Sequence, residues 1–195
     1  MARPKEFDRD EALQKAIGVF CEKGYAAAST DELMRAMNVS RQSMYDTYGD
    51  KRQLYLEAYR RYVADSINEQ IGHLERASSP LAGIEKMLLA FAARTEGDGI
   101  AGCMGINAIC EFGRTDSEVT SLSDTESARL TAALKLALRR AKAKKEISKT
   151  VKEGAAAQFL WATLSGMKVA AKAGADTHAL KSIAHFALRS LTSTQ

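Results

Sequence analysis

Residues 41–48, RQSMYDTY, bring together side chains that can recognise a nucleic acid. Arg41 can form two hydrogen bonds with the edge of a guanine, and Gln42 can do the same with an adenine. Ser43 and Tyr45 add hydroxyl groups of a size that suits base edges and phosphates. The chemistry open to this segment is therefore hydrogen bonding to bases and to a phosphate backbone.

The same segment predicts a short helix with one buried side. Ser40 is a suitable N-cap residue for it. At about 100° per residue, a buried Met44 brings Tyr48 to the inner side, while Gln42 and Asp46 point away. A helix this short cannot bury enough apolar area to be stable alone, so other helices must hold it.

Two helices are expected before this segment. The first covers about residues 8–23, and Gly24 can end it in the left-handed conformation. Ser29 is placed to cap the second helix, and Glu32 completes a capping-box pattern. Residues 38–39 then leave room for a single tight turn.

The rest of the chain also has helical patterns, and we predict an all-α fold. Only two prolines occur, and no run of β-branched or aromatic residues alternates over the length of a strand. No linker rich in Gly, Pro or Ser separates the first three helices from the fourth, so a continuous helix should join them to the remainder. The remaining helices are expected at residues 51–76, 80–95, 103–113, 117–145, 150–173 and 177–192.

Composition limits the classes of protein that fit this chain. It has 195 residues, of which 46% are hydrophobic, and no uncharged apolar run long enough to span a membrane, so a soluble cytoplasmic protein is expected. Three cysteines with no close spacing indicate neither a disulfide framework nor a zinc site. The first 52 residues hold nine Lys/Arg and nine Asp/Glu, so bulk charge does not explain what they bind.

No arrangement of residues typical of a catalytic site is recognisable. A nucleophile with its base, or paired carboxylates at a usable spacing, is not found, and no cofactor or metal is expected. A helical enzyme and a protein-binding helical adaptor remain as distant alternatives. An adaptor would not explain the outward row of polar side chains at residues 41–48.

The N-terminal pattern resembles the DNA-binding module of the tetracycline repressor (TetR) family of transcriptional regulators. The resemblance rests on "EKGYAAAST" followed by "DELMRAMNVSRQSMYDTYGDKRQLY" and covers about residues 8–60. It implies a helix-turn-helix DNA-binding domain at residues 1–50 and a helical domain for effector binding and dimerisation at residues 51–195. It also implies a homodimer that binds a near-palindromic double-stranded DNA operator and acts as a repressor.

By this resemblance, the third helix enters the major groove with three side chains nearest the bases, and the other side chains lie around it or on phosphates. An acid at position 46 departs from the neutral or aromatic residue that family members often carry. It either reads a cytosine amino group or points past the duplex. The residues expected at the DNA are Arg41, Gln42, Ser43, Tyr45, Asp46, Thr47, Tyr48, Lys51 and Thr30, with Arg3 and Lys5 as a flexible arm on the minor groove.

The resemblance further implies a pocket in the C-terminal half for a small, largely apolar effector that releases the DNA. The residues expected to line it are Tyr62, Met87, Phe91, Cys103, Met104, Asn107, Phe112 and Trp161. An alternative keeps the same fold but senses electrophiles or oxidants through Cys103 and Cys110, which seven-residue spacing places on one side of a helix. The basic cluster at residues 139–149 is interpreted as a solvated helix end, with a second nucleic-acid patch as its alternative.

Overall fold

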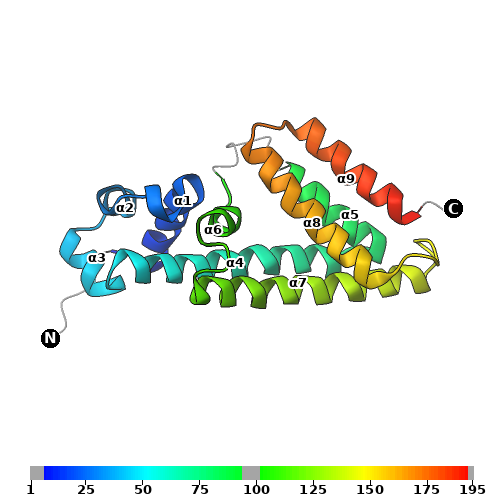
Figure 1. Ribbon diagram of the computed structural model, residues 1–195, viewed down its shortest axis with the longest axis horizontal. Coiled ribbons are helices and arrows are strands. Elements are labelled where there is room, and N and C mark those ends of the chain that lie inside the picture. The colour runs from blue at the N-terminus through cyan, green and yellow to red at the C-terminus, as the bar shows by residue number, and fades with distance from the viewer. Residues whose placement is uncertain (1–6, 94–101, 193–195) are drawn as a thin grey trace. The chain divides into compact units, whose positions relative to one another are not determined.

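The computed structural model describes residues 7–93 and 102–192 of the chain. Within these ranges every regular element is an α-helix, which confirms the predicted all-α fold. Figure 1 shows the helices in chain order. Their bounds are α1 (Arg9–Ala27), α2 (Thr30–Met37), α3 (Arg41–Tyr48), α4 (Lys51–Glu75), α5 (Pro80–Ala93), α6 (Met104–Phe112), α7 (Ser117–Ala143), α8 (Glu153–Lys172) and α9 (Thr177–Thr192).

The chain forms two compact units, each with its own apolar core. The N-terminal unit comprises residues 1–63 and 101–123, and the C-terminal unit comprises residues 64–100 and 124–195. The division falls inside α4 and inside α7. The N-terminal unit therefore includes α6, although this helix lies far from α1–α3 in the sequence. The domain boundary expected after residue 50 stays a prediction.

Helix α1 begins and breaks where the sequence predicts. The side chain of Asp8 accepts a hydrogen bond from the backbone N–H of Glu11, as an N-cap residue does. Gly24 has φ 80°, a conformation that favours glycine, and it interrupts the helical geometry. One further helical stretch follows this break, so α1 as a whole extends to Ala27 rather than ending at Lys23.

Helix α2 has the predicted capping box. Ser29 Oγ accepts from the backbone N–H of Glu32, and the Glu32 carboxylate accepts from the backbone N–H of Ser29. The same carboxylate pairs with the ammonium group of Lys23. The hydrogen bonds from Lys23 and then from Ser29 lower the pKa of Glu32 to about 2.

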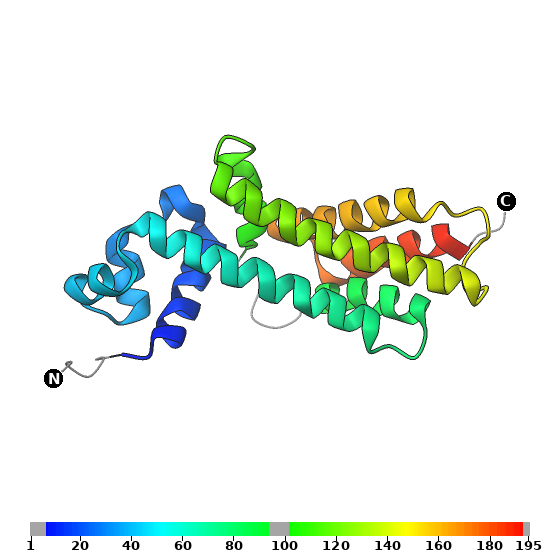
Figure 2. The ribbon, with the colours of Figure 1, turned by 90° about the horizontal axis from the view of Figure 1, so that it is seen from below.

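The turn between α2 and α3 depends on one residue in the left-handed region. Asn38 has φ 55° and ψ 48°, and its backbone N–H donates to the end of α2. Asparagine tolerates this conformation better than other residues with a side chain. Ser40 then caps α3 by accepting from the backbone N–H of Ser43, at 3.1 Å. Figures 1 and 2 both show α2 and α3 as short helices beside α1.

Helix α6 binds the broken end of α1 through two side chains one turn apart. Asn107 Nδ2 donates to the carbonyl oxygens of Phe20 and Cys21, at 3.1 and 2.9 Å. The Glu111 carboxylate accepts from the backbone N–H groups of Tyr25 and Ala26, at 2.9–3.0 Å. Carbonyl groups before the break and N–H groups after it thus find partners on one helix. We call this set of contacts the α6 latch.

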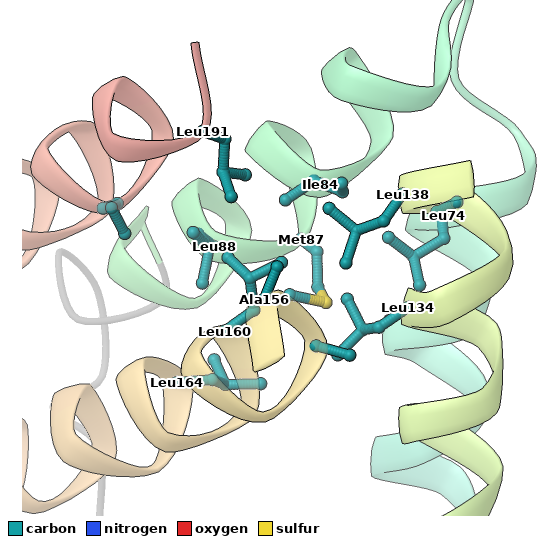
Figure 3. Packing of buried hydrophobic residues seen from close by; sticks show 14 of the residues in the cluster. Leu74, Ile84, Met87, Leu88, Leu134, Leu138, Ala156, Leu160, Leu164 and Leu191 are labelled. Carbon is teal, nitrogen blue, oxygen red and sulfur yellow. The ribbon is translucent and has the colours of Figure 1, made fainter. Parts of the chain in front are cut away.

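The core of the C-terminal unit is built mainly from leucine and alanine. Figure 3 shows Met87 of α5 between Leu160 of α8 and Leu134 of α7, with Leu88 of α5 on the side of Leu160 and Leu191. All five side chains are buried. A Cβ atom on Gly83 would lie 2.9 Å from the Leu74 carbonyl oxygen, so the glycine allows α5 to approach the end of α4 closely.

The predicted bounds are otherwise close to those observed. Helix α7 ends at Ala143 and α8 begins at Glu153, so the connection between them is longer than the spacing predicted. Lys145 in this connection has φ 59°, so the helical geometry stops before it, and α7 ends two residues before the predicted end at position 145. The connection between the helices expected at residues 80–95 and 103–113 lies almost wholly outside the described residues.

We predict that Glu111→Ala lowers the free energy of unfolding by about 1–3 kcal/mol, because two N–H groups lose their acceptor. Urea denaturation followed by circular dichroism measures the change. Cys110→Ala on the same helix is the matched control, since that side chain is exposed. Equal stability of the two variants would show that the α6 latch contributes nothing.

Candidate DNA-binding surface

The outward side of α3 carries the polar side chains that the sequence places there. Arg41, Gln42 and Asp46 are exposed, and Tyr45 retains 45% of its accessible surface. Met44 is fully buried in the N-terminal core. The helical-wheel prediction for α3 is therefore confirmed.

Two of the exposed side chains on α3 are held by acidic neighbours. Arg41 Nη2 donates to Asp31 Oδ1 of α2 at 2.8 Å. Gln42 Nε2 lies 3.1 and 3.2 Å from the two carboxylate oxygens of Asp46, one turn along the same helix. Both pairs lie on exposed surface, so their partners are exchangeable with solvent or with a bound molecule.

Three shorter polar side chains of α2 and α3 that were expected at the DNA are less exposed. Ser43 is half-buried, and its hydroxyl shares a hydrogen bond of 2.8 Å with the hydroxyl of Ser40. Thr47 is half-buried on the last turn of α3, and Thr30 is half-buried at the first position of α2. The first turn of α2 is partly capped by its own residues, since the N–H of Glu32 donates to Ser29 Oγ.

Tyr48 requires a correction to the predicted phosphate contacts. Its ring is 4% exposed, and its hydroxyl donates to the Arg9 carbonyl oxygen of α1 at 2.8 Å. Burial raises the pKa of this hydroxyl to about 12. Tyr48 therefore anchors α3 to α1, and in this arrangement its hydroxyl does not face a ligand.

Lys51 lies at the start of α4, close to an aromatic ring. Its Nζ is 4.5 Å from the centre of the Tyr25 ring, a cation–π distance. This contact holds the ammonium group near the end of α1, and the side chain remains half-buried. Arg3 and Lys5, predicted as a flexible arm, lie outside the described residues.

Five of the residues predicted to line an effector pocket belong to the N-terminal unit, and all of them have protein contacts there. Tyr62 donates its hydroxyl hydrogen to Cys103 Sγ at 3.2 Å. Met104 is fully buried, and the ring of Phe112 packs beside that of Tyr55. Asn107 is buried as expected, but its amide is bonded to α1, so a ligand could reach it only by breaking the α6 latch.

The other three predicted pocket residues belong to the C-terminal unit. Met87 and Phe91 of α5 are buried in its core, at 0% and 6% exposure. Trp161 of α8 is half-buried against the same core. The predicted pocket residues thus divide between the two units.

The two cysteines near α6 do not share one side of a helix, contrary to the prediction. Cys103 precedes the first turn of α6 and is 5% exposed, whereas Cys110 lies on the helix surface. Because Cys103 is outside the helix, a spacing of seven residues does not bring it onto the same face as Cys110.

Sequence reasoning missed three residues that the structure makes prominent. Asp31 and Glu111 looked like ordinary surface acids, because their partners are ten or more residues away. Gln70 of α4 is 3% exposed, and no described residue donates a hydrogen bond to its Oε1. A lone glutamine between Ile67, Ile71 and Leu74 is the pattern that could have indicated it.

Other kinds of site were sought over the same residues. In residues 7–93 and 102–192, no helix is long and apolar enough to cross a membrane. Across these two ranges, no group of three or more His, Cys, Asp or Glu side chains could hold a metal ion.

Comparison with protein families gives two matches. Residues 12–58 match the bacterial regulatory proteins of the tetR family, and residues 80–187 match a tetracyclin repressor-like C-terminal domain. The HTH-type transcriptional regulator YezE of Bacillus subtilis (strain 168) is 33% identical over 149 residues, 76% of this chain and 77% of that protein. The HTH-type transcriptional repressor ComR of Escherichia coli (strain K12) is 28% identical over 189 residues, 96% and 90% of the two chains.

A solved structure resembles the fold over nearly the whole chain. It is a cysteine mutant of the TetR family transcriptional regulator CifR in complex with a 26-base-pair double-stranded operator DNA. The two chains are 27% identical, with a TM-score of 0.85, and the match covers 97% of this chain and 100% of CifR. Together, the exposed polar side of α3, the two family matches and these relatives identify the chain as a member of the TetR family and a DNA-binding transcriptional regulator, not an enzyme.

Proposed function

We propose that the protein is a repressor that binds a two-fold symmetric operator as a homodimer and releases it when a small molecule binds. The observation that carries this proposal is the outward side of α3, where Arg41 and Gln42 are exposed while Met44 anchors the helix. Repression is favoured because ComR, 28% identical over nearly the whole chain, is described as a transcriptional repressor.

In the proposed complex, α3 lies in the major groove. Arg41 pairs with a guanine and Gln42 with an adenine or a neighbouring base, since these are the partners that their geometry suits. Ser43 lies next to them, and Tyr45 and Thr47 flank the groove. The first turn of α2 at Thr30 and the ammonium group of Lys51 bind phosphates.

Homodimer formation is supported by apolar side chains on the outside of α8 and α9. Phe159 and Val169 of α8 are 42% and 51% exposed, and Ile183 and Phe186 of α9 are 39% and 66% exposed. Large apolar side chains on two packed helices are typical of a surface that another protein covers. A second copy covering this surface would place two α3 helices on one operator.

The proposed effector is small and mostly apolar, and it carries at least one hydrogen-bond donor. Met87, Phe91 and Trp161 supply apolar surface in the C-terminal unit. Gln70 Oε1 is buried there, and no described residue donates a hydrogen bond to it. His73 Nε2 is also buried without a hydrogen bond to the described residues, and it lies 3.9 Å from Glu69 Oε1. A donor group on the effector would satisfy Gln70 Oε1, because a buried acceptor without a hydrogen bond costs free energy.

A second candidate is a thiol sensor of the same fold. It is favoured by the exposure of Cys110 on α6, the helix that carries the α6 latch. This candidate would be favoured over reversible binding if reactive compounds no longer released the Cys110→Ser variant from the operator, and if unreactive ligands never released the wild-type protein.

Since its partner is genomic DNA, we place the protein in the cytoplasm of a bacterial cell.

We predict that Arg41→Ala and Gln42→Ala each weaken operator binding by about 1–3 kcal/mol and relax the preference at one base pair. Lys51→Ala should weaken binding to all duplexes alike and reduce the salt dependence. Fluorescence anisotropy with duplexes mutated at each position measures both effects. Arg60→Ala is the matched control, because Arg60 is exposed in the same unit but lies outside α2 and α3. A uniform loss for Arg41→Ala across all duplexes would make Arg41 a phosphate contact.

We also predict that Gln70→Leu raises the free energy of unfolding by about 1 kcal/mol, because a buried unpaired acceptor is removed. The same change should abolish release of the operator by a compound that releases the wild-type protein. Thermal denaturation measures the change in stability, fluorescence anisotropy of a labelled operator measures its release, and quenching of the lone Trp161 reports whether the compound still binds. Gln14→Leu, an exposed position of α1, is the matched control. Lower stability of Gln70→Leu together with unchanged release would exclude Gln70 from the effector site.

A further inference from the structure

The residues that face the proposed DNA carry acids in direct contact with the base-reading side chains. Asp31 of α2 holds the guanidinium group of Arg41 at 2.8 Å, and Asp46 holds the amide nitrogen of Gln42 at 3.1 and 3.2 Å. Asp31 lies on α2 and Asp46 on α3, and each acid contacts one of the two side chains that we propose bind the bases.

Both acids are easily separated from their partners. The side chains of Asp31 and Arg41 are 70% and 61% exposed, so water and salt screen their attraction strongly. Gln42 and Asp46 are exposed as well. A ligand whose hydrogen-bonding groups suit Arg41 or Gln42 better than the aspartates do can therefore replace either contact. A ligand without such groups leaves both contacts in place.

The two acids oppose nonspecific binding to the DNA backbone. The carboxylates of Asp31 and Asp46 repel phosphates, and residues 1–52 carry nine basic and nine acidic side chains, with no excess of positive charge to offset this. A guanine edge can replace Asp31 as the acceptor for Arg41, because O6 and N7 both accept hydrogen bonds. With α3 in the major groove, the acceptors that Arg41 reaches are base edges, so a guanine at this position compensates for the release of Arg41 from Asp31.

Asp46 restricts the DNA sequence in a different way. With Nε2 of Gln42 turned toward Asp46, this pair presents mainly oxygen acceptors outward. Cytosine N4 and adenine N6 are the donors in the major groove, while guanine and thymine present acceptors at the corresponding positions. A guanine or thymine opposite the pair would face a carboxylate without a bridging hydrogen.

We propose that Asp31 and Asp46 determine the specificity of DNA binding: Asp31 holds Arg41 until a guanine edge replaces it, and Asp46, paired with Gln42, presents hydrogen-bond acceptors to one base. Asp31 is a positioning residue that acts through Arg41. Asp46 contacts a base itself and restricts one position of each half-site to cytosine or adenine. This inference rests on the proposed placement of α3 in the major groove.

The test compares two duplexes of about 30 base pairs, one recovered by selection from a random library with the wild-type protein and one scrambled. Asp31→Asn should tighten binding to the scrambled duplex by about twofold to fivefold, and the gain should shrink as salt is raised. In an Arg41→Ala background this gain should fall to the smaller part that comes from lost repulsion between Asp31 and phosphates, because Asp31 then has no partner to release.

Asp46→Asn should lower the preference for cytosine or adenine over guanine or thymine at one half-site position by about tenfold. Glu22→Gln, which removes an exposed acid of α1, is the matched control and should change neither quantity. Thermal denaturation confirms that each variant is folded.

The inference is overturned if both aspartate variants keep the wild-type ratio of affinities for the selected and scrambled duplexes, or if Asp31→Asn has the same effect without Arg41. Failure of the proposed function would look different. In that case the wild-type protein would select no sequence, or Arg41→Ala and Gln42→Ala would bind the selected duplex as the wild type does.

Discussion

The burial of Met44 and Tyr48 is the interaction on which the DNA-binding surface depends. Helix α3 has eight residues, too few to be stable in water without tertiary contacts. Met44 is fully buried, and Tyr48 adds a hydrogen bond from its hydroxyl to α1. Because both lie on one side, the opposite side of α3 is free to carry polar residues that contribute nothing to the core.

Helix α1 must itself be held in place if it is to support α3. It breaks at Gly24, and the α6 latch supplies partners for backbone groups on both sides of that break. The latch thereby ties the support of the DNA-reading helix to α6. Any change that shifts α6 along α1 would have to break these hydrogen bonds.

Local patterns in the sequence were sufficient for most of the fold. The caps at Ser29 and Ser40 and the positive φ of Gly24 are short-range features, and each is observed as predicted, although α1 resumes after Gly24 and extends to Ala27. The orientation of α3 followed from helical periodicity. Contacts between distant residues could not be predicted in this way: the partners of Glu111 and Asn107 are more than eighty positions away. The expectation that Tyr48 contacts DNA came from the resemblance and conflicted with its inner position on the helical wheel, and Cys103 was misplaced because α6 begins one residue after it.

The central claim is that two copies of α3 read the major groove of one symmetric operator. Methylation protection of guanine N7 on the selected duplex tests it most directly, because N7 lies in the major groove. The account predicts protected guanines in two major-groove segments related by two-fold symmetry, with centres about 34 Å or somewhat more apart, and loss of one protected guanine per half-site in Arg41→Ala. Protection of a single unsymmetrical segment, or none in the major groove, would contradict it.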